Sequence, residues 1–168
     1  LPMMGLHPCE VNNNTYESEL KHVEESLRNN NFIAVGEIGI DLHWNKQTLE
    51  IQKEVFLFQI KLAKKYSLPI VIHLRESFDE VIEIIEAEND ENLFGVFHCF
   101  SGDFNQANRV INLNGFYLGI GGVVTFKNSN LATIMKDIDL KHIILETDSP
   151  YLSPHPFRGK RNEPKNIL

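Results

Sequence analysis

Short, almost continuously apolar runs alternate with amphipathic segments along the whole chain. Runs of this kind are typical of strands that are buried on both faces of a parallel sheet. Strands that alternate with helices indicate repeated right-handed βαβ units. We expect six strands, at residues 3–7, 32–38, 69–74, 94–98, 116–121 and 142–147.

The segments between these runs have the three- and four-residue apolar spacing of amphipathic helices. Two of them also begin with the sequence of a capping box, Ser77–Glu80 and Asp103–Gln106. A shorter helix is expected around Leu131 and Ile134, before the last run. The two clearest helical faces consist of Tyr16, Leu20, Val23 and Leu27, and of Val55, Gln59, Leu62 and Tyr66.

This alternation predicts an α/β fold, and more specifically a (β/α)8 TIM barrel. A complete barrel needs eight strands and typically about 250 residues, whereas this chain has 168 residues and six runs. The chain also begins at Leu1 rather than at a methionine, and no strand precedes Gly5. We therefore expect one domain over residues 1–168 with about six βα units, N-terminally incomplete and lacking the first two strands.

Composition narrows the classes of partner. Lys plus Arg is 16 and Asp plus Glu is 23, which gives a net charge of −7. This balance argues against a broad nucleic-acid surface but leaves room for an enzyme whose bound cations supply local positive charge. Residues 158–161 form a tight basic cluster, for which charge alone favours a solvated loop.

The two cysteines, Cys9 and Cys99, lie far apart in the sequence and form no disulfide framework. A reducing environment is therefore expected, and we predict a cytoplasmic protein. The sequence has no apolar run as long as a membrane span, so no membrane partner is expected.

Four potential metal ligands fall at the C-terminal ends of four of the runs: Glu37, His73, His98 and Asp148. In a parallel α/β barrel these strand ends converge on one mouth, where active sites are built. One histidine at a strand end is more often structural, but two in consecutive units, with carboxylates before and after, favour a metal site. Imidazole and carboxylate together suit zinc or manganese better than calcium.

Several neighbours of these ligands have two interpretations. Glu37 itself could instead be a lining carboxylate paired with a cation. Asp41 could face the same mouth or cap a helix, and Glu146 is interpreted as a residue that orients a ligand. Arg75 lies at the rim, where a guanidinium could grip phosphate or form a surface salt bridge. His7 ends the first run and is a further candidate at the mouth.

Six motifs occur in order along the chain. They are Gly5-Leu-His-Pro8, Val35-Gly-Glu-Ile-Gly-Ile-Asp41, Pro69-Ile-Val-Ile-His-Leu-Arg75, Phe97-His-Cys-Phe-Ser-Gly102, Glu146-Thr-Asp-Ser-Pro-Tyr151 and Arg158-Gly-Lys-Arg-Asn-Glu-Pro164. Together they resemble the TatD-type metal-dependent DNases, a branch of the amidohydrolase-like TIM barrels. The resemblance covers essentially the whole chain.

The resemblance implies a hydrolase of DNA phosphodiester bonds, a deoxyribonuclease that trims single strands from the 3′ end. It implies two divalent cations, which could be Zn, Mg or Mn. Glu37 would contact both cations, His73 and His98 would hold one, and Asp148 would hold the other.

The same resemblance implies which residues lie near the substrate phosphate: His7, Arg75, and the loop from Arg158 through Arg161 to Glu163. As a mechanistic hypothesis, two cations about 4 Å apart would lower the pKa of a bridging water. Asp148 could then accept the proton of that water.

The chain departs from the family pattern in three places. The family carries a His-x-His pair on its first barrel strand, and this sequence has no such strand. Cys9 stands where relatives often have histidine, and Leu42 stands where tyrosine is commoner. Two alternatives therefore stay open: a metal-dependent hydrolase of a small amide, ester or phosphate substrate, or an inactive remnant.

Overall fold

The computed structural model describes residues 2–29 and 31–167, and it divides the chain into two compact units. The first unit comprises Leu1–Val96 with Leu113–Gly115, and the second comprises Phe97–Asn112 with Phe116–Leu168. The strand order in the sheet is β1-β2-β3-β4-β5, with no return to β1 within the described residues, so these strands do not close a barrel. The expected single domain over residues 1–168 stays a prediction.

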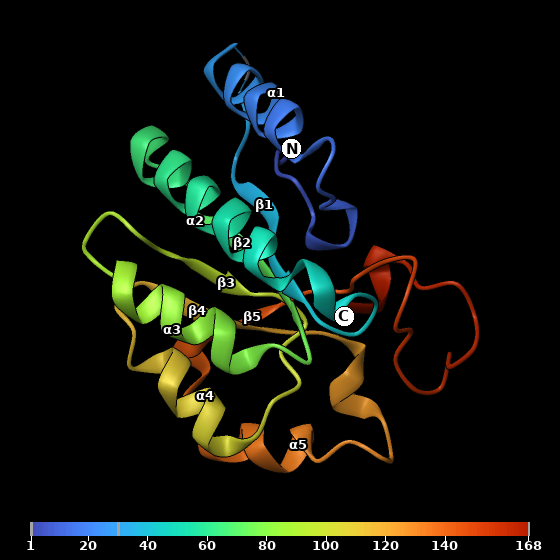
Figure 1. Cartoon of the computed structure of the whole chain (residues 1–168). Helices are drawn as coiled ribbons and strands as arrows, with labels where there is room; N and C mark the ends of the chain where they lie inside the picture. The colour runs from blue at the N-terminus through green and yellow to red at the C-terminus, as the bar shows by residue number, and fades with distance from the viewer. Residues whose placement is uncertain (1, 30, 168) are drawn as a thin grey trace. The chain divides into compact units, whose positions relative to one another are not determined.

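The first unit contains two long parallel strands with helices packed against them (Figure 1). Strands β1 and β2 pair from Val35 opposite Ile70 to Asp41 opposite Arg75. Helices α1 and α2 lie side by side, and α2 packs on β1. The elements are α1 (Tyr16–Asn29), β1 (Val35–Asp41), α2 (Leu49–Tyr66), β2 (Ile70–Arg75), α3 (Phe78–Glu88) and the start of β3 (Gly95–Phe97).

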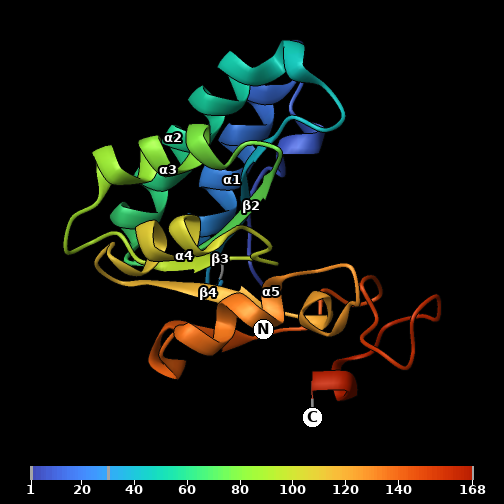
Figure 2. The same ribbon diagram turned by 90° about the horizontal axis from the view of Figure 1, so that it is seen from below.

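The second unit contains a shorter parallel pair, with Leu118 opposite Ile143 and Ile120 opposite Leu145. Helix α4 packs against β4, as Figure 2 shows. A 4-residue helix and several 3-10 turns fill the connection to the last strand. The elements are α4 (Phe104–Ile111), β4 (Phe116–Ile120), α5 (Leu131–Ile134) and β5 (Ile143–Leu145).

The predicted strand at 3–7 is wrong: among the described residues of this segment, only Met4 makes a β-bridge, with Val35. The reason lies at Leu6, two residues after Met4. The buried side chain of Gln59 in α2 accepts from the backbone N–H of Leu6 (2.6 Å) and donates to its carbonyl (3.1 Å). Because a side chain takes both polar groups of Leu6, these groups are not available to a β-ladder.

Two other details of the sequence interpretation need correction. Strand β1 begins at Val35 and continues to Asp41, three residues beyond the expected end, because Ile38 and Ile40 are both fully buried. The expected capping box at Ser77 is absent, since the Ser77 hydroxyl donates to the carbonyl of Ile40 (2.6 Å). The capping box of Asp103 and Gln106 at the start of α4 is confirmed.

Candidate metal centre

Glu37 lies within β1 rather than at its end, and the pairing with β2 is irregular there. Gly36 pairs with Val71 and Ile38 with the next residue, Ile72, so the register of the ladder shifts at Glu37. An extra residue of this kind is a β-bulge, which redirects a side chain and often occurs beside active sites. The Glu37 carboxylate remains about a quarter exposed, although its neighbours in β1 are buried.

His73 projects from β2 between two carboxylates. Its Nε2 lies 2.9 Å from Oδ2 of Asp41, and its Nδ1 lies 3.9 Å from Oε2 of Glu37. A carboxylate can only accept, so Nε2 donates to Asp41, and Nδ1 is the nitrogen that faces Glu37. This arrangement matches a metal-binding histidine whose second nitrogen is oriented by a carboxylate. Gly39, at φ 143°, permits the close approach of the β1 backbone to the β2 backbone at His73. A Cβ at Gly39 would lie 2.0 Å from the His73 carbonyl oxygen.

Asp41 has the environment of a buried anion. It is 2% exposed, and its carboxylate accepts from the backbone N–H groups of His43 (2.9 Å) and Trp44 (3.3 Å) as well as from His73. Burial alone would raise the pKa of Asp41, but these hydrogen bonds outweigh burial and lower it. Asp41 is therefore ionised at neutral pH. It caps the turn after β1 and also orients His73.

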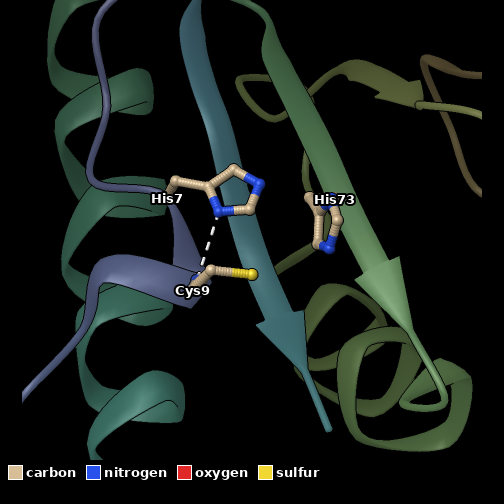
Figure 3. Close-up of side chains that lie close together, drawn as sticks. All are labelled: His7, Cys9 and His73. Atoms are coloured by element: carbon tan, nitrogen blue, oxygen red, sulfur yellow. Dashed lines mark hydrogen bonds between the residues drawn. The ribbon is translucent and has the colours of Figure 1, made fainter. Parts of the chain in front are cut away.

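His7 and Cys9 point toward His73, as Figure 3 shows. Ligand atoms of the three side chains lie within 4.8 Å of one another, and the rings of His7 and His73 are 4.4 Å apart between centroids. Burial and then the Asp41 carboxylate raise the pKa of Cys9 to about 11, so its neutral thiol donates to Asp41 over 3.5 Å. The group is therefore a hydrogen-bonded arrangement around His73 and Asp41 in which the Cys9 thiol is neutral.

The ring of His7 has a defined tautomer. Its Nδ1 accepts from the backbone N–H of Cys9 (3.1 Å), drawn as the dashed line in Figure 3. Burial, and next the charge of His73, lower the pKa of His7, which keeps the ring neutral near pH 7. A neutral ring that accepts at Nδ1 carries its proton on Nε2, which lies 3.7 Å from Glu37. His7 thus presents an N–H donor beside the Glu37 carboxylate.

In the second unit, His98 directly follows β3 and lies between two further carboxylates. Its Nδ1 lies 2.5 Å from Oε2 of Glu146, and its Nε2 lies 3.5 Å from Oδ1 of Asp148. Burial lowers the pKa of His98, but hydrogen bonds with Asp148, Cys99 and Glu146 outweigh it and raise the value to about 12. Glu146 therefore orients His98 as Asp41 orients His73, in agreement with its interpretation from the sequence.

Gly119 of β4 makes room for Glu146. A Cβ at this position would lie 2.5 Å from Oε1 of Glu146 and 3.0 Å from the carbonyl oxygen of Phe97. The same carboxylate accepts a hydrogen bond from the backbone N–H of Cys99. Because Gly119 of β4 has no side chain, the carboxylate of Glu146, which directly follows β5, has room to contact His98.

Asp148 lies three residues after β5, in a tight turn. Its backbone φ is 53°, in the left-handed region, which Asp tolerates better than most side chains. The N–H of Tyr151 donates to the Asp148 carbonyl (2.8 Å) and closes the turn. The side chain of Asn162 holds this turn from outside, donating to the carbonyl oxygens of Thr147 (2.6 Å) and Tyr151 (2.7 Å). The sequence interpretation missed Asn162, because no local spacing connects it to Asp148.

The three candidate phosphate-binding arginines are all exposed: Arg75, Arg158 and Arg161. The guanidinium of Arg75 lies 5.7 Å from the ring of Trp44, which is itself 72% exposed. That of Arg158 stacks 3.7 Å above the ring of Phe126. No salt bridge is described for these three guanidinium groups, among residues 2–29 and 31–167. They are available to bind an anion.

The donor sets fit divalent cations. Two ligand atoms that each lie about 2.1 Å from one cation are at most about 4.2 Å apart. The nitrogen-to-oxygen distances of 3.9 Å (His73 to Glu37) and 3.5 Å (His98 to Asp148) both satisfy this limit. With a cation bound, each pair would join one imidazole nitrogen to one carboxylate oxygen, and each imidazole is oriented by a second carboxylate.

The structure thus brings the predicted ligands together in pairs. Glu37 and His73 meet in the first unit, and His98 and Asp148 meet in the second. The predicted meeting of all four residues around shared cations stays a prediction.

The sequence of the chain is similar to those of known metal-dependent hydrolases. The model of the family described as TatD related DNase matches residues 1–168. A Bacillus subtilis protein named as an uncharacterized metal-dependent hydrolase, YabD, is 43% identical over 165 residues. That match covers 98% of this chain and 64% of the relative, so the chain spans just under two thirds of the length of that protein.

The fold of the chain is similar to those of solved TatD structures. The Escherichia coli K12 protein YjjV, titled a TatD homologue, superposes with a TM-score of 0.88 at 31% identity. A TatD family hydrolase from Entamoeba histolytica superposes with a TM-score of 0.78 at 25% identity. Both matches cover 98% of this chain and 64% of the other. In the described part of the chain, no helix is both long and apolar enough to cross a membrane.

Proposed function

Because the chain belongs to the TatD-related DNase family, we propose that it hydrolyses DNA phosphodiester bonds with the help of two divalent cations. We further propose that it removes nucleotides from the 3′ end of single strands. The observation that carries this proposal is the orientation of His73 and His98. In each ring one nitrogen donates to a carboxylate, while the other faces a candidate ligand, Glu37 or Asp148.

In this proposal Glu37, His73, His98 and Asp148 hold the cations. Bound divalent cations would lower the pKa of a water molecule and neutralise charge that develops on the phosphate. The donor set of nitrogen and oxygen atoms suits Zn or Mn, and Mg where further water ligands are present.

The protein's own groups orient the substrate and move the proton. The N–H at Nε2 of His7 donates to a phosphate oxygen in place of its present neighbour Glu37. Arg75, Arg158 and Arg161 offer planar, bidentate donors that match phosphate geometry. Asp148 also accepts the proton of the attacking water, because a carboxylate held at the reaction site can serve as a general base.

Both cysteines are free thiols. Free thiols support placing the reaction in the reducing cytoplasm.

The test uses the protein with single-stranded DNA labelled at its 5′ end and Mn²⁺ present. We expect a ladder that shortens from the 3′ end, no cleavage after treatment with a chelator, and a loss of at least about 100-fold in Asp148→Asn, because general-base catalysis typically contributes about 10²–10⁴. Asp139→Asn is the matched control. The exposed Asp139 carboxylate accepts from the backbone N–H of Lys141 and caps that turn, so the variant should retain the activity of the unmodified protein.

Cleavage that persists unchanged both in chelator and in Asp148→Asn would contradict the proposal. Turnover of small aryl esters or phosphates with DNA left intact would instead favour a hydrolase of small substrates.

A further inference from the structure

Asn162 is a buried polar residue that the chemistry described so far does not use. It is 2% exposed, and it directly follows the basic loop, residues 153–161. Its side chain nevertheless contacts the turn that carries Asp148, eleven to fifteen residues earlier.

Three hydrogen bonds join Asn162 to this turn. The side-chain Nδ2 donates to the carbonyl oxygens of Thr147 (2.6 Å) and Tyr151 (2.7 Å), and the backbone N–H donates to that of Pro150 (2.9 Å). The two side-chain contacts fall on either side of Asp148, at the entry and the exit of the turn. Together they fix the ends of the segment from which the Asp148 carboxylate projects.

The acceptor atom of the same amide is also in use. Oδ1 of Asn162 accepts from the backbone N–H of Glu163 (2.9 Å) and from Nδ2 of Asn166 (3.0 Å). Both amide protons and the carbonyl oxygen therefore have partners, which fixes the orientation of the amide. Among side chains of this size, only that of asparagine offers two N–H donors and a carbonyl acceptor on one planar group.

The turn depends on contacts from outside, because Asp148 adopts a left-handed backbone conformation. For residues other than glycine, such a conformation persists when the surroundings over-determine it. The N–H of Tyr151, bonded to the Asp148 carbonyl, closes the turn from within. Asn162 supplies the contacts from outside.

We propose that Asn162 is a positioning residue that holds the Asp148 turn in place and couples it to the basic loop of residues 153–161. The inference deepens the proposed function, in that Asp148 is taken as a cation ligand. The loop has its own closure, since the buried hydroxyl of Ser153 donates to the carbonyl oxygen of Lys160 (2.6 Å). Asn162 adds the connection from this loop to the ligand.

The experiment compares Asn162→Ala and Asn162→Asp with the unmodified protein. The first variant removes all side-chain contacts. The second keeps the shape but replaces two donors by an oxygen that faces the carbonyl oxygens of Thr147 and Tyr151. Two quantities are measured: the hydrogen-exchange rate of the Tyr151 amide without added metal, and the affinity for Mn²⁺ by calorimetric titration.

We expect both variants to show at least about 10-fold faster exchange at Tyr151 and an Mn²⁺ affinity lowered by about 10- to 100-fold, the range found when a residue that orients metal ligands is removed. Ser153→Ala is the matched control, because it loosens the basic loop but leaves the contacts of Asn162 with the turn. It should keep the Mn²⁺ affinity of the unmodified protein.

A second measurement separates positioning from general loosening. In an Asp148→Asn background, Asn162→Ala should lower the Mn²⁺ affinity by less than about 3-fold further, because coupled residues are not additive. Unchanged exchange at Tyr151, or an equal loss of affinity in both backgrounds, would overturn the inference. If the protein binds Mn²⁺ in this coupled way but does not cleave DNA, the proposed function fails and the role of Asn162 stands.

Discussion

At the scale of single residues, the recurring unit is a histidine between two carboxylates. In each case the nearer carboxylate, Asp41 or Glu146, accepts a hydrogen bond from the ring. The more distant one, Glu37 or Asp148, faces the other nitrogen. With a cation bound, the nearer carboxylates would hold the proton on one ring nitrogen and leave the other nitrogen to the cation.

Asp41→Asn tests this logic. The new amide would keep an oxygen for the N–H of His43 and turn its NH2 group toward His73. An NH2 donor selects the tautomer with its proton on Nδ1, which cannot bind a cation. We expect the Mn²⁺ affinity to fall by about 10- to 100-fold, as is typical when the carboxylate partner of a ligating histidine is lost.

Calorimetric titration measures this effect, with Asp139→Asn as the control because Asp139 also caps a turn but contacts no histidine ring in the described contacts. An affinity equal to that of the unmodified protein would mean that Asp41 does not set the tautomer of His73.

The sequence identifies candidate ligands but not all of the residues that contact them. The candidate ligands stand out because histidines and carboxylates follow apolar runs. The role of Glu146 follows from its two-residue spacing to Asp148 in an extended segment. Asp41 is ambiguous in sequence because a four-residue spacing suits either a strand or a helix cap. The role of Asn162 depends on a loop returning to a distant turn, and no periodicity reports that.

At the scale of elements, the position of His98 depends on how closely β4 and β5 approach. Gly119 of β4 is paired with Ile144 of β5. The side chain of Glu146, two residues farther along the chain, occupies the space next to this glycine.

Gly119→Ala should therefore displace Glu146 and disturb His98. The added Cβ would lie 2.5 Å from a carboxylate oxygen that has little freedom, since it also accepts from the backbone N–H of Cys99. We expect the pKa of His98 in chelator-treated protein to fall from about 12 toward the ordinary value, because one of the carboxylates that raise it moves away.

NMR titration of the His98 ring measures this change. Gly121→Ala is the matched control, since a Cβ there has its nearest contact at 3.4 Å, with the Glu146 carbonyl oxygen. A His98 titration in Gly119→Ala that coincides with that of Gly121→Ala would show that the glycine has no such role.

The sequence predicts which strands and helices occur better than it predicts where they begin and end. Each apolar run from residue 32 onward overlaps a strand, and the longest helices are where their spacing predicts them. The error in β1 arises from Phe32 and Ile33, which are apolar but lie before the strand, with Ile33 49% exposed. Hydropathy alone cannot distinguish these residues from the buried Ile38 and Ile40.

At the scale of the whole molecule, under the proposed function, the net charge limits how DNA can bind. The net charge of −7 disfavours a broad contact with a polyanion. Contacts with DNA are therefore expected at few points, namely the cations and the three exposed arginines, Arg75, Arg158 and Arg161.

Salt dependence measures how many phosphates are contacted. Three contacts on single-stranded DNA predict a slope of about −2 for the logarithm of affinity against the logarithm of salt concentration, since each contact adds about −0.7. Fluorescence anisotropy with an oligonucleotide of non-hydrolysable linkages, at constant Mg²⁺, gives this slope. Arg158→Ala should make it shallower by about 0.7. A slope steeper than about −5 would indicate an extended basic surface instead.

The bulge at Glu37 has a consequence for how this strand tolerates change. Since the register of β1 with β2 shifts at Glu37, loss of its single codon would join Gly36 to Ile38 in regular register. The shortened chain would keep the pairing of its buried isoleucines with β2 while losing the carboxylate that faces His73. One in-frame deletion could thus convert a candidate catalytic strand into an ordinary structural one.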